Sequence, residues 1–403
     1  MTSRLSKTIP YLDQLLVSGS SFLTIAICAH RFSLIEQGKL GYVFAIYMAT
    51  IVIQGTLIHN WASVQFPRRN NQYRYHQSLA LMGVVLALIS AVLLCIAMYW
   101  LAISAGWVVT YKTLALTFVY LLLQQAVDFL RKAAYYADHQ EKALWISAML
   151  YPLRIVLLLT TAVTTIDDVL TISMLSCGLP LLWFVKLSNV SRCYSRRQLT
   201  RISFTHLKGS SQLGIMAVIT WAWNYLPVFF LGSSNGAAAV ALLVSLRSLS
   251  NLFNVVLEVL ETSFATKFAN TYAAGRNWRV VIKKEYINGF VLWFCGLIFL
   301  LVMHRTIVPI ALGQNFIAYD HLITLFWIAQ GFTFLFRIEG VKLRTMGLTH
   351  LITLANLYAL VFVSTIGWMV INQYGVNGAT ALYICAPLVV FIGQSVGYKR
   401  RLK

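Results

Sequence analysis

Residues Ala237–Glu261 read AAAVALLVSLRSLSNLFNVVLEVLE, a segment long and apolar enough to cross a bilayer as one helix. Its polar residues recur every three or four positions, which draws a single stripe along an α-helix. The stripe consists of Arg247, Asn251, Asn254, Glu258 and Glu261. A charge that faces lipid costs about 2.5–3.5 kcal/mol even on lenient insertion scales. The stripe therefore predicts a helix that lines a protein interior or a water-filled transport cavity.

Composition extends this prediction to the whole chain. Hydrophobic residues make up 59% of the 403 residues and charged residues only 11%, against about 25% charged residues in ordinary soluble domains. About twelve apolar segments, each of roughly twenty residues, use most of the length and leave only short connections. We therefore predict an all-α polytopic membrane protein built from two six-helix bundles, residues 1–190 and 209–403, with a basic cytoplasmic joint at residues 191–208.

The net charge of +20 is explained by membrane topology. If the N-terminus is cytoplasmic, most of the 32 lysines and arginines fall in loops on the inner side, as the positive-inside rule requires. This distribution predicts a multi-pass protein with both termini in the cytoplasm. We expect membrane lipids as partners and no nucleic acid, because the basic charge already has a topological explanation.

Motifs for catalysis or cofactor binding do not occur in the sequence. HExxH, GxSxG, the Walker A pattern and GxGxxG in its proper context are missing, and the six cysteines occur singly. We expect no enzymatic activity, no cofactor and no metal site.

Two arginines inside apolar spans are the main candidates for a ligand site. Arg154 lies near the bilayer midplane if its span covers 143–164, and Arg247 lies in the striped helix. Arginine stays charged when buried and offers several fixed donors, which suits a phosphate or a carboxylate. The alternative is structural: backbone carbonyls, or a carboxylate such as Asp13 or Glu258, would satisfy each guanidinium.

Further polar residues extend the candidate site. The predicted substrate contacts, besides the two arginines, are Arg31, Gln54, Asn224, Asn251 and Asn254. Carboxylates buried in a membrane commonly carry protons or cations. The predicted ion-coupling residues are Glu258, Asp13 and Glu261. The alternative is that the two glutamates lie in water at the inner membrane surface.

Other local patterns predict structure rather than chemistry. Asp128 and Arg131 stand three residues apart, which suits an ion pair on one helix. The tripeptide Asn-Gly-Ala occurs at 235–237 and at 377–379, and each glycine permits a tight turn into a span.

An internal duplication is suggested by a shift of 198 residues. This shift aligns Gln14 with Gln212 and Gly38 with Gly236, and it matches the hydropathy of the first two spans to that of the seventh and eighth. The pattern favours a six-plus-six layout of the spans.

Three stretches carry a resemblance to a known family. They are Leu12–Phe22 (LDQLLVSGSSF), the Glu36-x-Gly38 turn, and Phe129-x-Arg131-Lys132 followed by Tyr135 and Ala137. With the predicted spans, they resemble bacterial polysaccharide exporters. These are the lipid-linked oligosaccharide flippases of the superfamily that also contains the multidrug and toxin extruders.

The resemblance implies a V-shaped pair of six-helix bundles around a cationic central cavity in the bacterial inner membrane. It also implies that an undecaprenyl-diphosphate-linked oligosaccharide moves to the outer leaflet by alternating access, for O-antigen, capsule or exopolysaccharide assembly. By charge and depth, Arg154, Arg247 and Arg31 match the cationic cavity. Polysaccharide assembly proteins are the implied protein partners.

Two other functions stay open at this point. A cation-coupled multidrug or small-molecule antiporter has the same architecture, but its site would be acidic and aromatic, which the buried arginines disfavour. A membrane glycan polymerase or ligase needs catalytic groups at the outer face, and no outer connection exceeds about fifteen residues. We predict a flippase.

Overall fold

The structure is a computed structural model. It describes residues 2–66, 69–107, 109–187, 196–252, 261, 264–265, 267–272, 274–275 and 277–402. Asn254 and Glu258 of the predicted stripe lie outside the described residues, so their placement stays a prediction.

The described residues are almost all helical, as the apolar segments predict. The elements are α1 (Thr2–Arg31), α2 (Leu34–Gln54), the π-helical turn η1 (Gly55–Asn60), α3 (Trp61–Gln65), α4 (Gln72–Ser104), α5 (Tyr111–Tyr136), α6 (Gln140–Thr160), α7 (Ile166–Leu187), α8 (Arg196–Ser250), α10 (Trp278–Leu312), the 3₁₀ turn η3 (Gln314–Tyr319), α11 (Leu322–Thr345) and α12 (Thr349–Leu402). Ten helical stretches of the described chain are long and apolar enough to cross a membrane. Two of them, α8 and α12, each break at a glycine into two spans, so the predicted all-α membrane architecture is confirmed.

The two breaks occur where glycine relieves a strained backbone. Gly236 has φ 79° and ψ 177°, and Gly375 has φ 55° and ψ −128°. A positive φ is costly for a residue that has a side chain. The first break matches the predicted Asn-Gly-Ala turn. The second break lies at Gly375, three residues before the predicted Gly378, and Gly378 permits the tight turn, because a Cβ there would be 2.4 Å from the Val370 carbonyl oxygen.

The chain divides into two compact units. The N-terminal unit comprises Met1–Phe32 and Tyr42–Trp221, and the C-terminal unit comprises Ser33–Gly41 and Ala222–Lys403. The division falls inside α8, and the sequence-based bounds of the two bundles stay a prediction.

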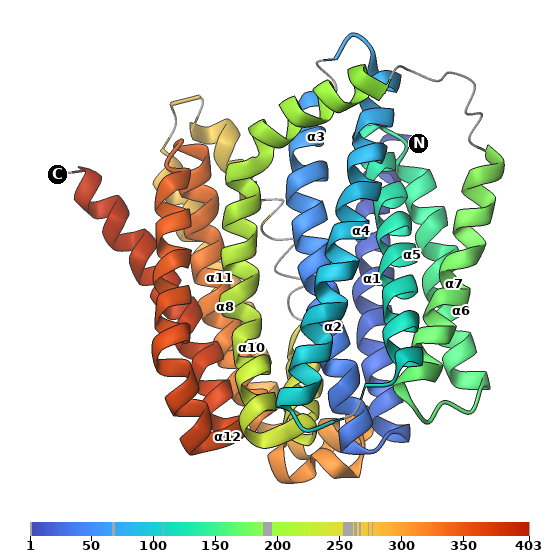
Figure 1. Ribbon diagram of the computed structural model, residues 1–403. Helices are drawn as coiled ribbons and strands as arrows, with labels where there is room; N and C mark the ends of the chain where they lie inside the picture. The colour runs from blue at the N-terminus through green and yellow to red at the C-terminus, as the bar shows by residue number, and fades with distance from the viewer. Residues whose placement is uncertain are drawn as a thin grey trace. The chain divides into compact units, whose positions relative to one another are not determined.

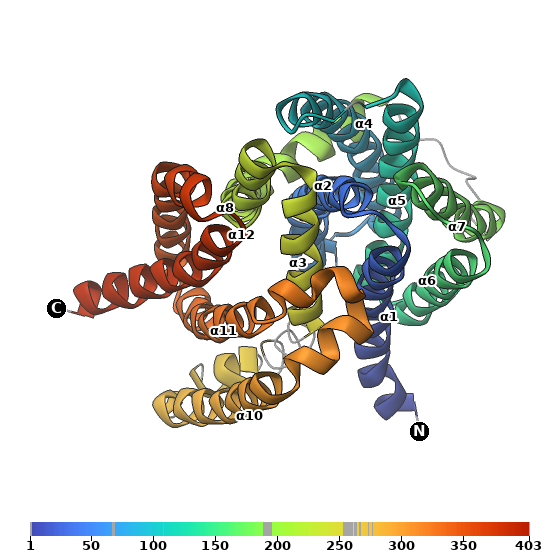
Figure 2. The same cartoon turned by 90° about the horizontal axis from the view of Figure 1, so that it is seen from below.

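Within the N-terminal unit, α5 is the central helix. It packs against α4, α6 and α7, and α6 also packs against α1. Figure 2 shows these helices in an arc beside α2. Buried apolar side chains such as Val127, Ile146 and Leu150 fill the contact between α5 and α6. Exposed apolar residues such as Leu88 and Val92 line α4, which suits contact with lipid.

Within the C-terminal unit, α10, α11 and α12 pack in chain order, as Figure 1 shows from yellow to red. Two tryptophans fix α10 against α11. The indole N–H of Trp293 donates to the Trp327 carbonyl oxygen and the indole N–H of Trp327 to the Trp293 carbonyl oxygen, both over 2.9 Å. Gly296 and Gly331 leave room for the rings, since a Cβ at these positions would lie 2.1 and 2.7 Å from the opposing indole.

The first turns of α2 belong to the C-terminal unit because they pack closely on α8. Gln37 Nε2 donates to Ser245 Oγ over 3.0 Å, and a Cβ on Gly38 would lie 1.8 Å from the Ala237 carbonyl oxygen. The atoms that such a Cβ would meet belong to the backbone of Ala237, which cannot rotate away as a side chain can. The contact brings Gly38 next to Gly236, the residue that the 198-residue shift aligns with it.

Replacing Gly38 by alanine is expected to destabilise the protein, although alanine is the better helix former. In an open helix the change stabilises by about 0.5–1 kcal/mol, whereas forced overpacking costs about 1–3 kcal/mol. Thermal unfolding of the purified protein measures the difference. Gly19→Ala is the matched control, because nothing lies within 4 Å of a Cβ there. Equal unfolding temperatures for the two variants would contradict the close approach.

Candidate functional site

Arg154 is buried on α6 of the N-terminal unit, with 7% of its surface exposed. Nη2 donates to Gln124 Oε1 of α5 over 2.6 Å, and Nε donates to Ser176 Oγ of α7 over 3.3 Å. Cys177 Sγ accepts a longer contact, 3.7 Å from Nη2. These contacts join α6 to α5 and α7 through the guanidinium.

The depth of Arg154 differs from the prediction. The sequence predicts a span that ends at residue 164, whereas α6 ends at Thr160. Arg154 is therefore about 9 Å from the nearer helix end at 1.5 Å per residue. Arg154 therefore lies nearer to the carboxyl end of α6, where Arg31 binds, than the predicted position at the midplane.

Arg247 reaches from α8 to α12 in the C-terminal unit. Nη1 donates to Tyr383 Oη over 2.7 Å and to the Asn224 carbonyl oxygen over 3.1 Å. Nη2 donates to Asn224 Oδ1 over 3.2 Å. The Tyr383 and Tyr225 ring centroids lie 4.2 and 5.0 Å from Cζ, within range of a cation–π interaction. The structure thus brings the predicted residues Asn224 and Arg247 together.

Neither arginine lies within 4.0 Å of a carboxylate among the described residues. Their partners are neutral: two amides, two hydroxyls, a thiol and a backbone carbonyl. Neutral acceptors satisfy the N–H groups but leave the positive charge uncompensated, which is costly in a desolvated interior. Both units therefore present a cation within a membrane span, and each cation can accept an anionic ligand.

Asp13 pairs with neither of these arginines. Arg131 Nη1 donates to Asp13 Oδ2 over 2.7 Å. Tyr135 Oη donates to the same oxygen over 2.7 Å, and Ser147 Oγ donates to Oδ1. Asp13 therefore ties α1 to α5 and α6. The predicted Asp128–Arg131 pair is also present, at 3.7 Å.

Glu261 forms ion pairs with two arginines of α11. Its carboxylate lies 2.5 Å from Arg344 Nη2 and 3.6 Å from Arg337 Nη1. Glu258 lies outside the described residues. The two described coupling candidates, Asp13 and Glu261, thus stand beside arginines, and their role in ion coupling stays a prediction.

Two of the remaining predicted substrate contacts, Gln54 and Asn251, hydrogen-bond to neighbouring helices. Gln54, at the end of α2, is buried and donates from Nε2 to the Gln125 carbonyl oxygen over 3.2 Å. Asn251 Oδ1 accepts from Gln330 Nε2 over 2.9 Å. Asn254 lies outside the described residues. The structure joins Asn251 to α11 and Gln54 to α5.

Arg31 stands at the carboxyl end of α6. Nη1 donates to the carbonyl oxygens of Leu158 and Thr161 over 2.6 and 2.8 Å, and Nη2 donates to that of Leu159 over 3.0 Å. These carbonyls have no partner within the helix, and a cation there is stabilising. This geometry gives Arg31 a helix-capping role, and its contact with substrate stays a prediction.

Several partners of the candidate residues were not predicted from the sequence. Gln124 had a usable signal, because it belongs to a polar stripe with Thr117, Tyr120, Asp128 and Arg131 at helical spacing. Tyr383 and Gln330 were not singled out, because each of their spans carries other polar residues, such as Thr380 and Thr333. Only the packing of α11 and α12 against α8 reveals them.

The arrangement around the two arginines suits the binding of an anion. Among the described residues, no group of three or more His, Cys, Asp or Glu side chains could hold a metal ion. Each unit offers a guanidinium surrounded by amide, hydroxyl and aromatic groups. Such a group recognises phosphate or carboxylate oxygens.

Comparison with known protein families and with curated proteins finds no match. Solved structures do match over nearly the whole chain. An inward-facing multidrug resistance MATE family transporter of the MOP superfamily has a TM-score of 0.74 at 13% identity, covering 96% of this chain and 95% of that one. The lipid II flippase MurJ, in an inward closed conformation, has a TM-score of 0.72 at 10% identity, covering 98% and 87%.

The chain therefore has a MATE-like fold. A third match is a MOP superfamily transporter from Pyrococcus furiosus, described as having a binding pocket of reverse polarity, with a TM-score of 0.61 at 13% identity over 99% of this chain and 97% of that one. At these identities the likeness establishes the fold.

Proposed function

We propose that the protein is a flippase. It moves undecaprenyl-diphosphate-linked oligosaccharide across the bacterial inner membrane by alternating access, for the assembly of surface polysaccharide such as O-antigen. The observation that carries the proposal is a pair of guanidiniums with no carboxylate partner among the described residues, Arg154 in one unit and Arg247 in the other. A diphosphate provides the missing negative charge and several acceptor oxygens.

The fold supports a transporter, since the similar solved structures are named as transporters or as a flippase. The match named as a lipid II flippase favours a lipid-linked substrate. The predicted topology, with both termini in the cytoplasm, fits a carrier that takes its substrate from the inner leaflet. Polysaccharide assembly proteins are the partners that this function requires.

The second candidate is a multidrug antiporter, which the match to a multidrug resistance transporter favours. Aromatic rings beside Arg247 would suit a flat organic ligand. A cationic drug would nevertheless meet the positive guanidinium without an acidic group to offset it among the described residues. An anionic substrate is therefore the better fit.

We further propose Asp13 as the ion-coupling residue, with Glu258 and Glu261 as the alternative. Asp13 is 2% exposed and is held by three side chains from α5 and α6. Protonation of Asp13 would weaken its pair with Arg131 and so loosen α1. Glu261, by contrast, is partly exposed beside two arginines.

The test is transport in reconstituted vesicles by wild-type protein and two variants of Arg247. A fluorescent lipid-linked glycan is inserted, and its accessibility to an impermeant quencher reports flipping. We expect Arg247→Gln to reduce the rate at least tenfold, because a charge-assisted contact is worth about 1.5–3 kcal/mol. Arg247→Lys should retain part of the rate, since it keeps the charge but not the planar donor geometry.

Arg305→Gln is the matched control, because Arg305 is an exposed arginine of α10. It should flip the glycan at the wild-type rate. Full flipping by a correctly folded Arg247→Gln variant would refute the proposed role of this arginine. Efflux of a cationic dye without any glycan flipping would instead establish the antiporter.

A further inference from the structure

A cavity with a partly polar lining lies in the N-terminal unit, and Arg154 is not among its lining residues. Its volume is about 710 Å³, within the range of roughly 300–1,000 Å³ that is usual for small-molecule sites. The residues that matter for its chemistry are His59, Asn60, Ser63, Lys132, Tyr135 and Asp138. They come from η1, α3 and the end of α5, so the cavity lies near the ends of two candidate membrane spans.

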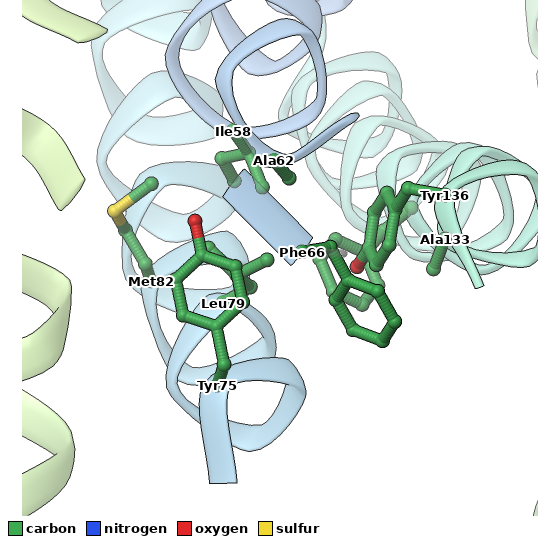
Figure 3. Close-up of a cluster of buried hydrophobic side chains, with 9 residues drawn as sticks. Ile58, Ala62, Phe66, Tyr75, Leu79, Met82, Ala133 and Tyr136 are labelled. Carbon is green, nitrogen blue, oxygen red and sulfur yellow. The ribbon is translucent and has the colours of Figure 1, made fainter. Parts of the chain in front are cut away.

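Aromatic rings pack along one wall of this cavity. Figure 3 shows Phe66 and Tyr136 side by side in a cluster of buried hydrophobic residues, with ring centroids 5.0 Å apart. The His59 ring lies against Phe129 and Tyr136, with centroid distances of 5.4 and 6.1 Å. Aromatic packing of this kind fixes the orientation of the imidazole before any ligand arrives.

The π-helical turn η1 that carries His59 is itself held in place. His206 Nε2 donates to the Leu57 carbonyl oxygen over 2.9 Å, and Tyr75 Oη donates to His206 Nδ1 over 2.6 Å. A π-turn shifts the following side chains around the helix axis and often occurs at functional sites. In this protein, hydrogen bonds through His206 stabilise the π-turn and so hold His59 in position beside the cavity.

Two nitrogen groups in the cavity have no partner among the described residues. His59 is 5% exposed, yet neither Nδ1 nor Nε2 makes a hydrogen bond to any of them. Lys132 Nζ makes no hydrogen bond or ion pair to them either, and it lies over Gly55, 3.2 Å from the position of a Cβ there. Buried polar groups are almost always satisfied, so the unpartnered imidazole of His59 beside a cavity indicates a ligand, and the partly buried amine of Lys132 adds a positive charge.

We propose that this cavity binds a phosphate group, contributed by a phospholipid headgroup or by a soluble phosphate. Lys132 provides the positive charge, and His59 donates a hydrogen bond from its ring. Asp138, at the exposed rim, accepts from a hydroxyl or ammonium group of the same molecule. The site does not depend on the proposed flippase function, since it uses none of the residues of that mechanism except Tyr135, which it shares with Asp13.

The test is binding to the purified full-length protein after exchange into lipid-free, phosphate-free detergent. The probes are inorganic phosphate, short-chain phosphatidylethanolamine, short-chain phosphatidylglycerol and a short-chain diacylglycerol that lacks phosphate. We expect saturable thermal stabilisation by phosphate-bearing probes and none by diacylglycerol. Stabilisation by inorganic phosphate identifies a soluble source as sufficient, and stabilisation by the two phospholipids alone identifies a headgroup. No response to any phosphate-bearing probe overturns the site.

Lys132→Gln should weaken binding at least tenfold. The control, Lys142→Gln, changes an exposed lysine at the start of α6 and should change binding less than twofold. An independent measurement uses the unaltered protein: a saturating probe should slow amine acylation of Lys132 at least threefold, as read by mass spectrometry. Equal affinity of Lys132→Gln and wild type, or unchanged acylation of Lys132, overturns the proposal.

Discussion

The unfolding temperature of the Arg131→Met variant is expected to be much lower than that of the wild-type protein. Arg131 lies between Asp13 at 2.7 Å and Asp128 at 3.7 Å, and both carboxylates are 2% exposed. Removing one partner of a buried ion pair leaves an uncompensated charge and costs about 3–5 kcal/mol. The measurement is thermal unfolding in detergent, together with the fraction of protein that elutes as a single species.

The charge argument has its own control. In the triple variant Arg131→Met, Asp13→Asn and Asp128→Asn, neither carboxylate remains to be left without its arginine, so most of the lost stability should return. If the single variant unfolds at the wild-type temperature, the ion pairs of α1 and α5 do not hold the unit together. If the triple variant is no more stable than the single one, packing and not charge explains the loss.

Arg154→Gln is expected to separate transport from stability. Glutamine keeps a donor for Gln124 and removes a buried positive charge that no described carboxylate offsets. Replacing a buried charge by a neutral group is commonly neutral or stabilising. We therefore expect the unfolding temperature to be maintained or raised, while glycan flipping falls at least tenfold because the anionic substrate loses its counter-charge.

The flipping rate and the unfolding temperature test different roles of Arg154. A variant that flips at the wild-type rate would remove Arg154 from the substrate site. A large loss of stability would instead assign Arg154 a structural role in joining α5, α6 and α7. A substitution that raises stability and lowers transport commonly marks a functional residue.

The positions of the spans follow from the sequence because a bilayer leaves little choice. A segment of about twenty apolar residues must become a helix, since lipid offers no partner for exposed backbone groups. Ala237 starts a span in the structure, as the glycine at position 236 predicts. Helix ends were less predictable: α6 stops at Thr160, where Arg31 from another helix caps its carbonyls.

The candidate site was predictable in part. The cost of a charge in a membrane singles out Arg154 and Arg247 from the sequence alone, because such a residue must face a protein interior or water. The same argument cannot tell which neutral side chains surround each guanidinium. Tyr383 lies 136 residues from Arg247 along the chain, and only the fold brings the two within 2.7 Å.

The sequence by itself determined that this chain is a helical membrane protein with rare buried charges, because hydropathy and the cost of a lipid-exposed charge are local properties of each segment. Tertiary structure alone decided how those charges are partnered. It placed Asp13 beside Arg131, left Arg154 and Arg247 with neutral acceptors, and opened a cavity beside His59 and Lys132. The physical reason is that electrostatic energy depends on distances between helices, and helix packing sets those distances across long separations in sequence.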